Sequence, residues 1–98
     1  MTRFALVIPF CLMALPAVAQ DKQTLCTTSA EIVESAVTAR ADGAKERAVI
    51  RDITGTLDGD KAVFKPAVEP IVNWVYTLPE DQLTGEVATV YKDTCLKN

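Results

Sequence analysis

The residues of this chain best suited to chemistry are two cysteines, Cys26 and Cys95, which lie near the two ends of its polar part. A redox-active pair is normally close together in the sequence, as in Cys-x-x-Cys, and this pair is not. We therefore expect a structural disulfide bond between them. Because it closes a loop of about 70 residues, this bond should stabilise the fold by about 4 kcal/mol.

The chain contains no histidine, which is the commonest general base, metal ligand and pH switch in proteins. It has no glycine-rich phosphate loop and no Gly-x-Ser-x-Gly sequence. The run Asp58-Gly59-Asp60 lacks the alternating acidic residues and the closing glutamate of a calcium loop. We therefore expect no enzyme activity, no metal and no cofactor. A small carboxylate- or thiol-dependent enzyme is the alternative.

Arg40 is the most unusual charged residue, because it falls within the apolar face of the helix expected around it. It lies one turn before the expected helix end, where its side chain can reach water and bind the last carbonyl groups. A salt bridge would also account for it, and so would a contact with an anion or a partner protein. The carboxylates available for such a bridge are those of Asp42, Asp52 and Glu69.

Arg47 and Arg51 extend this positive region and, with Arg40, form a candidate contact surface for a partner or an anion. A solvated helix face, or attraction to the acidic last helix of the same chain, would explain the same charges. Tyr76 is a further candidate contact, because it lies at the edge of its helical stripe. Trp74 shares a face with apolar residues, so we expect it in the core.

Residues 1–19 are typical of a signal peptide: Arg3 precedes a short apolar stretch that ends in Ala17-Val18-Ala19. Two prolines interrupt the stretch, which is too short to span a bilayer comfortably. We expect cleavage after Ala19, export to the periplasm or secretion, and no stable membrane insertion afterwards. Residues 20–98 then form one small domain.

Removal of residues 1–19 leaves nine basic and thirteen acidic residues, and therefore a net charge of −4. This balance argues against nucleic acid as a partner. A domain of this size buries only about 60–65% of the surface of its unfolded chain, so its core alone is marginal. The expected disulfide would supply part of the missing stability.

Thr28 and Glu31 have the spacing of a capping box, which predicts the start of a helix over residues 28–41. Gly43 is expected to end this helix. The polar residues 20–25 before it are expected to be loose.

Three more helices are expected. The second covers residues 44–54. The third begins at Pro66 or Pro70 and ends at Pro79, with a distortion because a proline inside a helix removes a hydrogen bond. The last follows Thr84, a candidate N-cap, and its apolar residues recur at helical spacing. These are Leu83, Val87, Val90, Tyr91 and Cys95.

Four consecutive antiparallel helices return the chain to the end at which it started, which brings Cys26 and Cys95 together. Three helices of equal length would leave them at opposite ends. We therefore predict an all-α fold: a small four-helix array closed by the Cys26–Cys95 disulfide.

Three segments carry a resemblance to a widespread group of small exported proteobacterial proteins. They are the helix end from Ala39 to Gly43, the run from Ile71 to Pro79, and the cysteines at both ends. The resemblance implies a helical fold with one disulfide and implies no particular activity. In size, helicity and disulfide the chain is more distantly similar to acid-stress periplasmic chaperones and to immunity proteins against type VI secretion effectors. No residue role carries over from either.

Together these observations favour a non-catalytic exported protein that binds another exported protein as an inhibitor, an immunity factor or a chaperone. A structural accessory of an envelope complex is the alternative.

Overall fold

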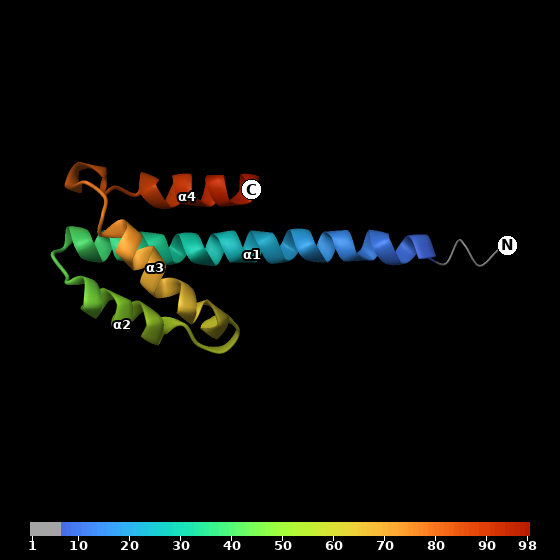
Figure 1. Ribbon diagram of the computed structural model, residues 1–98, viewed down its shortest axis with the longest axis horizontal. Coiled ribbons are helices and arrows are strands. Elements are labelled where there is room, and N and C mark those ends of the chain that lie inside the picture. Colours follow the sequence, from blue (N-terminus) through green and yellow to red (C-terminus); the bar gives the residue numbers. More distant parts are fainter. Residues whose placement is uncertain (1–6) are drawn as a thin grey trace.

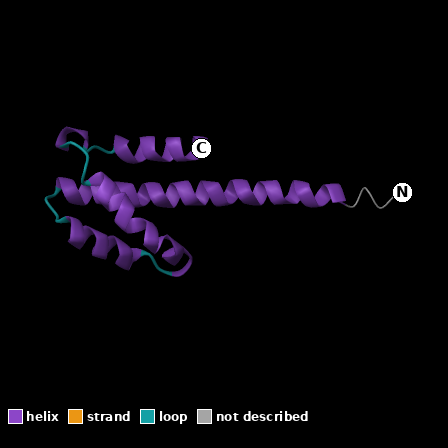
Figure 2. Ribbon diagram, viewed as in Figure 1, coloured by secondary structure: helices purple, strands orange, loops and turns teal. Residues whose placement is uncertain are grey.

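A computed structural model describes the backbone of residues 7–98 and the side chains of residues 21–98 (Figure 1). As predicted, this part of the chain is all-helical and contains no strand (Figure 2). Four α-helices are joined by short links, and two of these links contain a 3-10 turn. In chain order the elements are α1 (Val7–Ala41), α2 (Glu46–Thr56), η2 (Gly59–Phe64), α3 (Lys65–Val75), η3 (Glu80–Gln82) and α4 (Glu86–Lys97).

Helix α1 is 35 residues long and begins well before the predicted start at Thr28. Residues 20–27 contain no glycine and no proline, so no backbone feature ends the helix there. The predicted capping box and the predicted loose segment 20–25 are therefore wrong: Thr28 lies within α1 and is 5% exposed. Of the expected signal peptide, residues 1–6 lie outside the described part, and the backbone of residues 7–19 forms the first turns of α1.

No helix in the described part of the chain combines the length and the hydropathy needed to cross a membrane.

Helix α1 ends where the sequence predicted. Gly43 has a φ of 91°, in the left-handed region that glycine adopts without strain. The N–H of Gly43 donates to the carbonyl oxygen of Arg40 at 2.9 Å, and the N–H of Ala44 donates to that of Ala39 at 3.0 Å. These two bonds form a Schellman motif, which satisfies the last carbonyl groups of the helix and turns the chain toward α2.

Helix α3 begins at Lys65, with Pro66 in its first turn, so the earlier of the two predicted starts is the observed one. Pro70 lies inside the helix. The hydrogen bond that Pro70 cannot donate would have gone to the carbonyl of Pro66, four residues earlier. Pro66 itself costs no hydrogen bond, because the first N–H groups of a helix have no partner within it. The cost therefore comes from Pro70 alone.

Helix α1 is the centre of the molecule. Helices α2, α3 and α4 all pack on it, and α2 also packs on α3. In Figure 1, α3 crosses α1 obliquely, whereas α4 runs alongside it in the opposite direction. The core is built from small branched side chains of α1, α2 and α3, with one alanine from α4. Its buried members include Val33, Ala36, Val37, Val49, Ile53, Val68, Val72, Val75 and Ala88.

The predicted disulfide is present and joins α1 to α4. The Cα atoms of Cys26 and Cys95 are 5.7 Å apart. Cys26 is completely buried, and Cys95 lies in the last turn of α4. The bond therefore fixes the C-terminal end of α4 against the middle of α1.

Replacing both cysteines (Cys26→Ser with Cys95→Ser) should lower the free energy of unfolding by about 4 kcal/mol, because the bond spans 69 positions. Denaturant unfolding monitored by circular dichroism measures the change. Thr94→Ser, an exposed change in the same helix, is the matched control and should leave the unfolding midpoint unchanged. A double serine variant as stable as the parent would contradict this role of the disulfide.

Candidate functional site

The C-terminal ends of α1 and α3 meet at Arg40. Its Nη1 atom donates hydrogen bonds to the carbonyl oxygens of Val75, at 2.7 Å, and Leu78, at 2.5 Å. The guanidinium group thus satisfies carbonyls at the end of α3, where the helix dipole also favours a positive charge. The predicted role in binding carbonyls is therefore observed, but on α3 and not on Arg40's own helix.

Tyr76 completes this contact. Its hydroxyl donates to the carbonyl oxygen of Ala44, at 2.5 Å, and its ring lies 5.5 Å from the guanidinium carbon of Arg40. Burial raises the pKa of the Tyr76 hydroxyl above its ordinary value of 10.0; the charge of Arg40 lowers it and that of Glu46 raises it, both by less. We call Arg40, Ala44, Val75, Tyr76 and Leu78 the Arg40 corner.

Of the four predicted contact residues, the structure brings Arg40 and Tyr76 together and leaves Arg47 and Arg51 apart. Arg47 and Arg51 are exposed on α2. Among the side chains that the structure describes, the one ion pair joins Lys61 to Glu31 at 3.5 Å. The alternative that Arg40 forms a salt bridge is therefore not observed.

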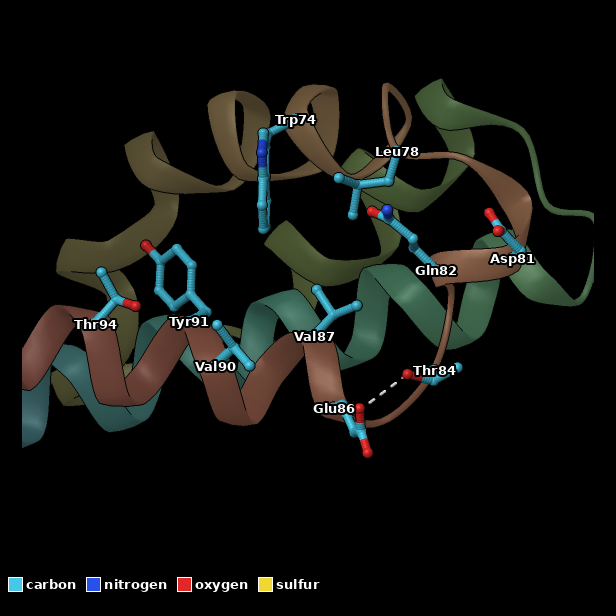
Figure 3. A pocket seen from close by; sticks show the side chains of 10 residues that line it. All are labelled: Trp74, Leu78, Asp81, Gln82, Thr84, Glu86, Val87, Val90, Tyr91 and Thr94. Carbon is cyan, nitrogen blue, oxygen red and sulfur yellow. Dashed lines mark hydrogen bonds between the residues drawn. The ribbon is translucent and has the colours of Figure 1, made fainter.

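A groove opens between α3 and α4 (Figure 3). It has a volume of about 550 Å³ and mostly apolar walls. The end of α3, the η3 turn and the outer face of α4 all contribute to it. We call it the Trp74 groove; its lining residues are Trp74, Leu78, Asp81, Gln82, Thr84, Glu86, Val87, Val90, Tyr91 and Thr94.

Trp74 and Tyr91 face each other across one end of this groove. Their ring centroids are 5.9 Å apart, with the planes tilted by 43°, which is within the range of favourable aromatic pairs. Trp74 is nevertheless 41% exposed, and Val90 is 61% exposed. The prediction that Trp74 lies in the core is therefore wrong, because α4 packs on α1 and leaves the outer face of α3 uncovered.

The charged residues that line the groove are both acidic. Asp81 comes from η3 and Glu86 from the first turn of α4, and no lysine or arginine is among the lining residues. The Thr84 hydroxyl accepts a hydrogen bond of 3.3 Å from the backbone N–H of Glu86 (Figure 3). The N-cap of α4 is nevertheless Gly85, so the predicted N-cap at Thr84 is wrong by one residue.

The two carboxylates do not form a pair. In Figure 3 they lie on different parts of the rim, and the side chain of Glu86 turns away from the space in front of Trp74. Acid–base catalysis by two carboxylates needs both to converge on one bond. Across the residues that the structure describes, no three histidine, cysteine or acidic side chains form a group able to hold a metal ion. Because its walls are mostly apolar, the groove is suited to contact with apolar surface.

The sequence singles out Trp74 but does not predict the groove that it lines. One signal was available: the apolar residues of α3 cover more of the helix surface than contact with α1 and α2 requires. Val90 lies on the predicted apolar stripe of α4, and the structure shows that it faces the groove and not the core.

No protein-family model, no curated protein and no solved structure matches this chain.

Replacing Arg40 with methionine should lower the free energy of unfolding by about 2–3 kcal/mol. The change removes two charge-assisted hydrogen bonds, to the carbonyls of Val75 and Leu78. The Val75 carbonyl keeps a bond from the N–H of Leu78 at 3.2 Å, so the larger loss is at Leu78. Denaturant unfolding measures it. Arg47→Met, which removes an exposed arginine of α2, is the matched control and should change stability by less than about 0.5 kcal/mol. Equal effects of the two substitutions would contradict the structural role of Arg40.

Tyr76 should make the fold sensitive to alkaline pH. Because the pKa of its hydroxyl is raised on folding, the stabilising effect is fully present below pH 10 and is lost as the pH rises through the folded pKa. Unfolding midpoints compared at pH 9 and 11 should therefore fall less in Tyr76→Phe than in the parent. Tyr91→Phe is the control and should keep the parent's fall. A tyrosinate absorbance titration of Tyr91→Phe, which retains only Tyr76, should have its midpoint above pH 10; a midpoint at or below 10 would contradict the assignment.

Proposed function

We propose that this chain is an exported, non-catalytic binding protein that holds another exported protein at the Trp74 groove. The observation that carries this proposal is the exposure of Trp74 and Val90 on one continuous apolar surface. Exposed apolar patches bordered by polar residues are typical of interaction sites. Tryptophan and tyrosine are also the residues most enriched among those that dominate binding energy.

The position of the groove between two helices that are fixed to α1 supports binding to a defined segment of a partner. Its walls belong to α3 and α4, and both helices are fixed to α1, one by the Arg40 corner and the other by the disulfide. A site on rigid elements loses little conformational entropy when a partner binds. Inhibitor, immunity and chaperone roles all need such a site, and a structural accessory of an envelope complex is the alternative role.

Two observations support export. Residues 1–19 have the pattern of a signal peptide. The Cys26–Cys95 disulfide would persist in the periplasm or outside the cell, whereas thiols in the cytosol are kept reduced. Arg47 and Arg51, exposed on α2, remain candidates for a second contact with the partner.

A photo-crosslinking amino acid placed at Val90 should capture one discrete partner protein in the cells that make this chain. The same group at Asp52, an exposed position on α2, is the control and should not capture that protein. Capture should fall at least about tenfold with Trp74→Ala, because truncating a central aromatic residue commonly costs more than about 1.4 kcal/mol of binding. The intact mass of the same preparation should show that residues 1–19 are removed.

Equal capture of the same protein from Val90 and Asp52 would contradict the assignment of the groove as the binding site. So would capture of a second copy of the chain alone, or a yield at Val90 that Trp74→Ala leaves unchanged.

A further inference from the structure

We infer that the segment held by the Trp74 groove is a positively charged amphipathic helix of the partner protein; this inference rests on the proposed function. The first argument is shape. The groove follows α4 from Glu86 to Thr94, or about 12 Å, and continues along η3. A partner helix of about three turns fits beside it. Grooves between two helices commonly bind a helix whose apolar residues recur at every third or fourth position.

The second argument is charge. Asp81 and Glu86 line the groove, and both are acidic. The lysines of α4, Lys92 and Lys97, are not among the lining residues. The positive end of the α4 dipole, equivalent to about half a charge, also lies at this rim. It is smaller than the two carboxylate charges, so the rim stays negative although the Glu86 side chain turns away from Trp74. A basic segment is therefore attracted to the rim and an acidic one is repelled.

The third argument is the chemistry of the aromatic wall. Trp74 keeps 41% of its surface exposed although it contacts Tyr91. Exposed faces of tryptophan and tyrosine attract lysine and arginine as well as apolar side chains. A segment that alternates leucine-like and basic residues along one helix can thus use both the wall and the rim.

The fluorescence of Trp74 gives a direct test, because it is the one tryptophan of the chain. The full chain is titrated with two synthetic peptides of about 14 residues that place leucines at helical spacing. One carries lysines at all other positions and the second carries glutamates. The leucine–lysine peptide should shift the emission of Trp74 to shorter wavelength and bind at least about tenfold more tightly than the leucine–glutamate peptide at low salt.

Two variants locate the interaction. Asp81→Asn with Glu86→Gln should weaken the leucine–lysine peptide by about three- to tenfold and remove most of the difference between the peptides. Val90→Glu should abolish the emission shift with the leucine–glutamate peptide, and Arg47→Gln, on α2, should change nothing for either peptide.

Each contrary outcome identifies what fails. Equal binding of both peptides would overturn the basic partner and leave the groove as a docking site. No shift with either peptide would overturn the groove itself, and with it the proposed function. A shift that appears on concentrating the chain alone would assign the groove to a second copy. A shift with phosphatidylcholine vesicles, and none with the peptides, would assign the groove to lipid. Either of these last two results would overturn the inference.

Discussion

The placement of α4 along α1 is the constraint on which the rest of the structure depends, and it is fixed at two points. The disulfide holds the last turn of α4 at Cys26. The start of α4 follows η3, which in turn follows the end of α3 that Arg40 binds. Cys26 and Arg40 are 14 positions apart on one helix, or about 21 Å. A single rigid helix therefore sets both ends of the groove.

The groove stays open because of how α3 and α4 approach α1. Helix α3 crosses α1 obliquely, whereas α4 runs along it, so α3 and α4 are not parallel to each other (Figure 1). To cover Val90, α4 would have to rotate or move toward α3. Such a movement would draw Ala88 away from the core, and the bond at Cys95 opposes it.

Features set by local sequence could be predicted, and features set by how helices meet could not. The glycine turn at Gly43 was predicted correctly because backbone conformation is a local property. The Cys26–Cys95 bond, although not local, was predicted correctly because these are the two cysteines outside residues 1–19. Thr28 has the pattern of a cap, but a cap forms only where the preceding residues leave the helix, and here they do not. For Trp74 and Arg40, helical periodicity correctly showed which face of its helix each residue lies on. It could not tell which neighbouring element, if any, covers that face.

The open groove has a cost that the disulfide offsets. Full burial of an apolar side chain such as Trp74 or Val90 stabilises a fold by about 1.5–3 kcal/mol, and a chain of this size has little such stabilisation to lose. The disulfide contributes about 4 kcal/mol through the unfolded state, without needing any core volume. A small domain can therefore keep apolar surface available to a partner because it is oxidised. The proposed export and the proposed binding are linked in this way, since the compartment that preserves the bond also makes the exposed groove affordable.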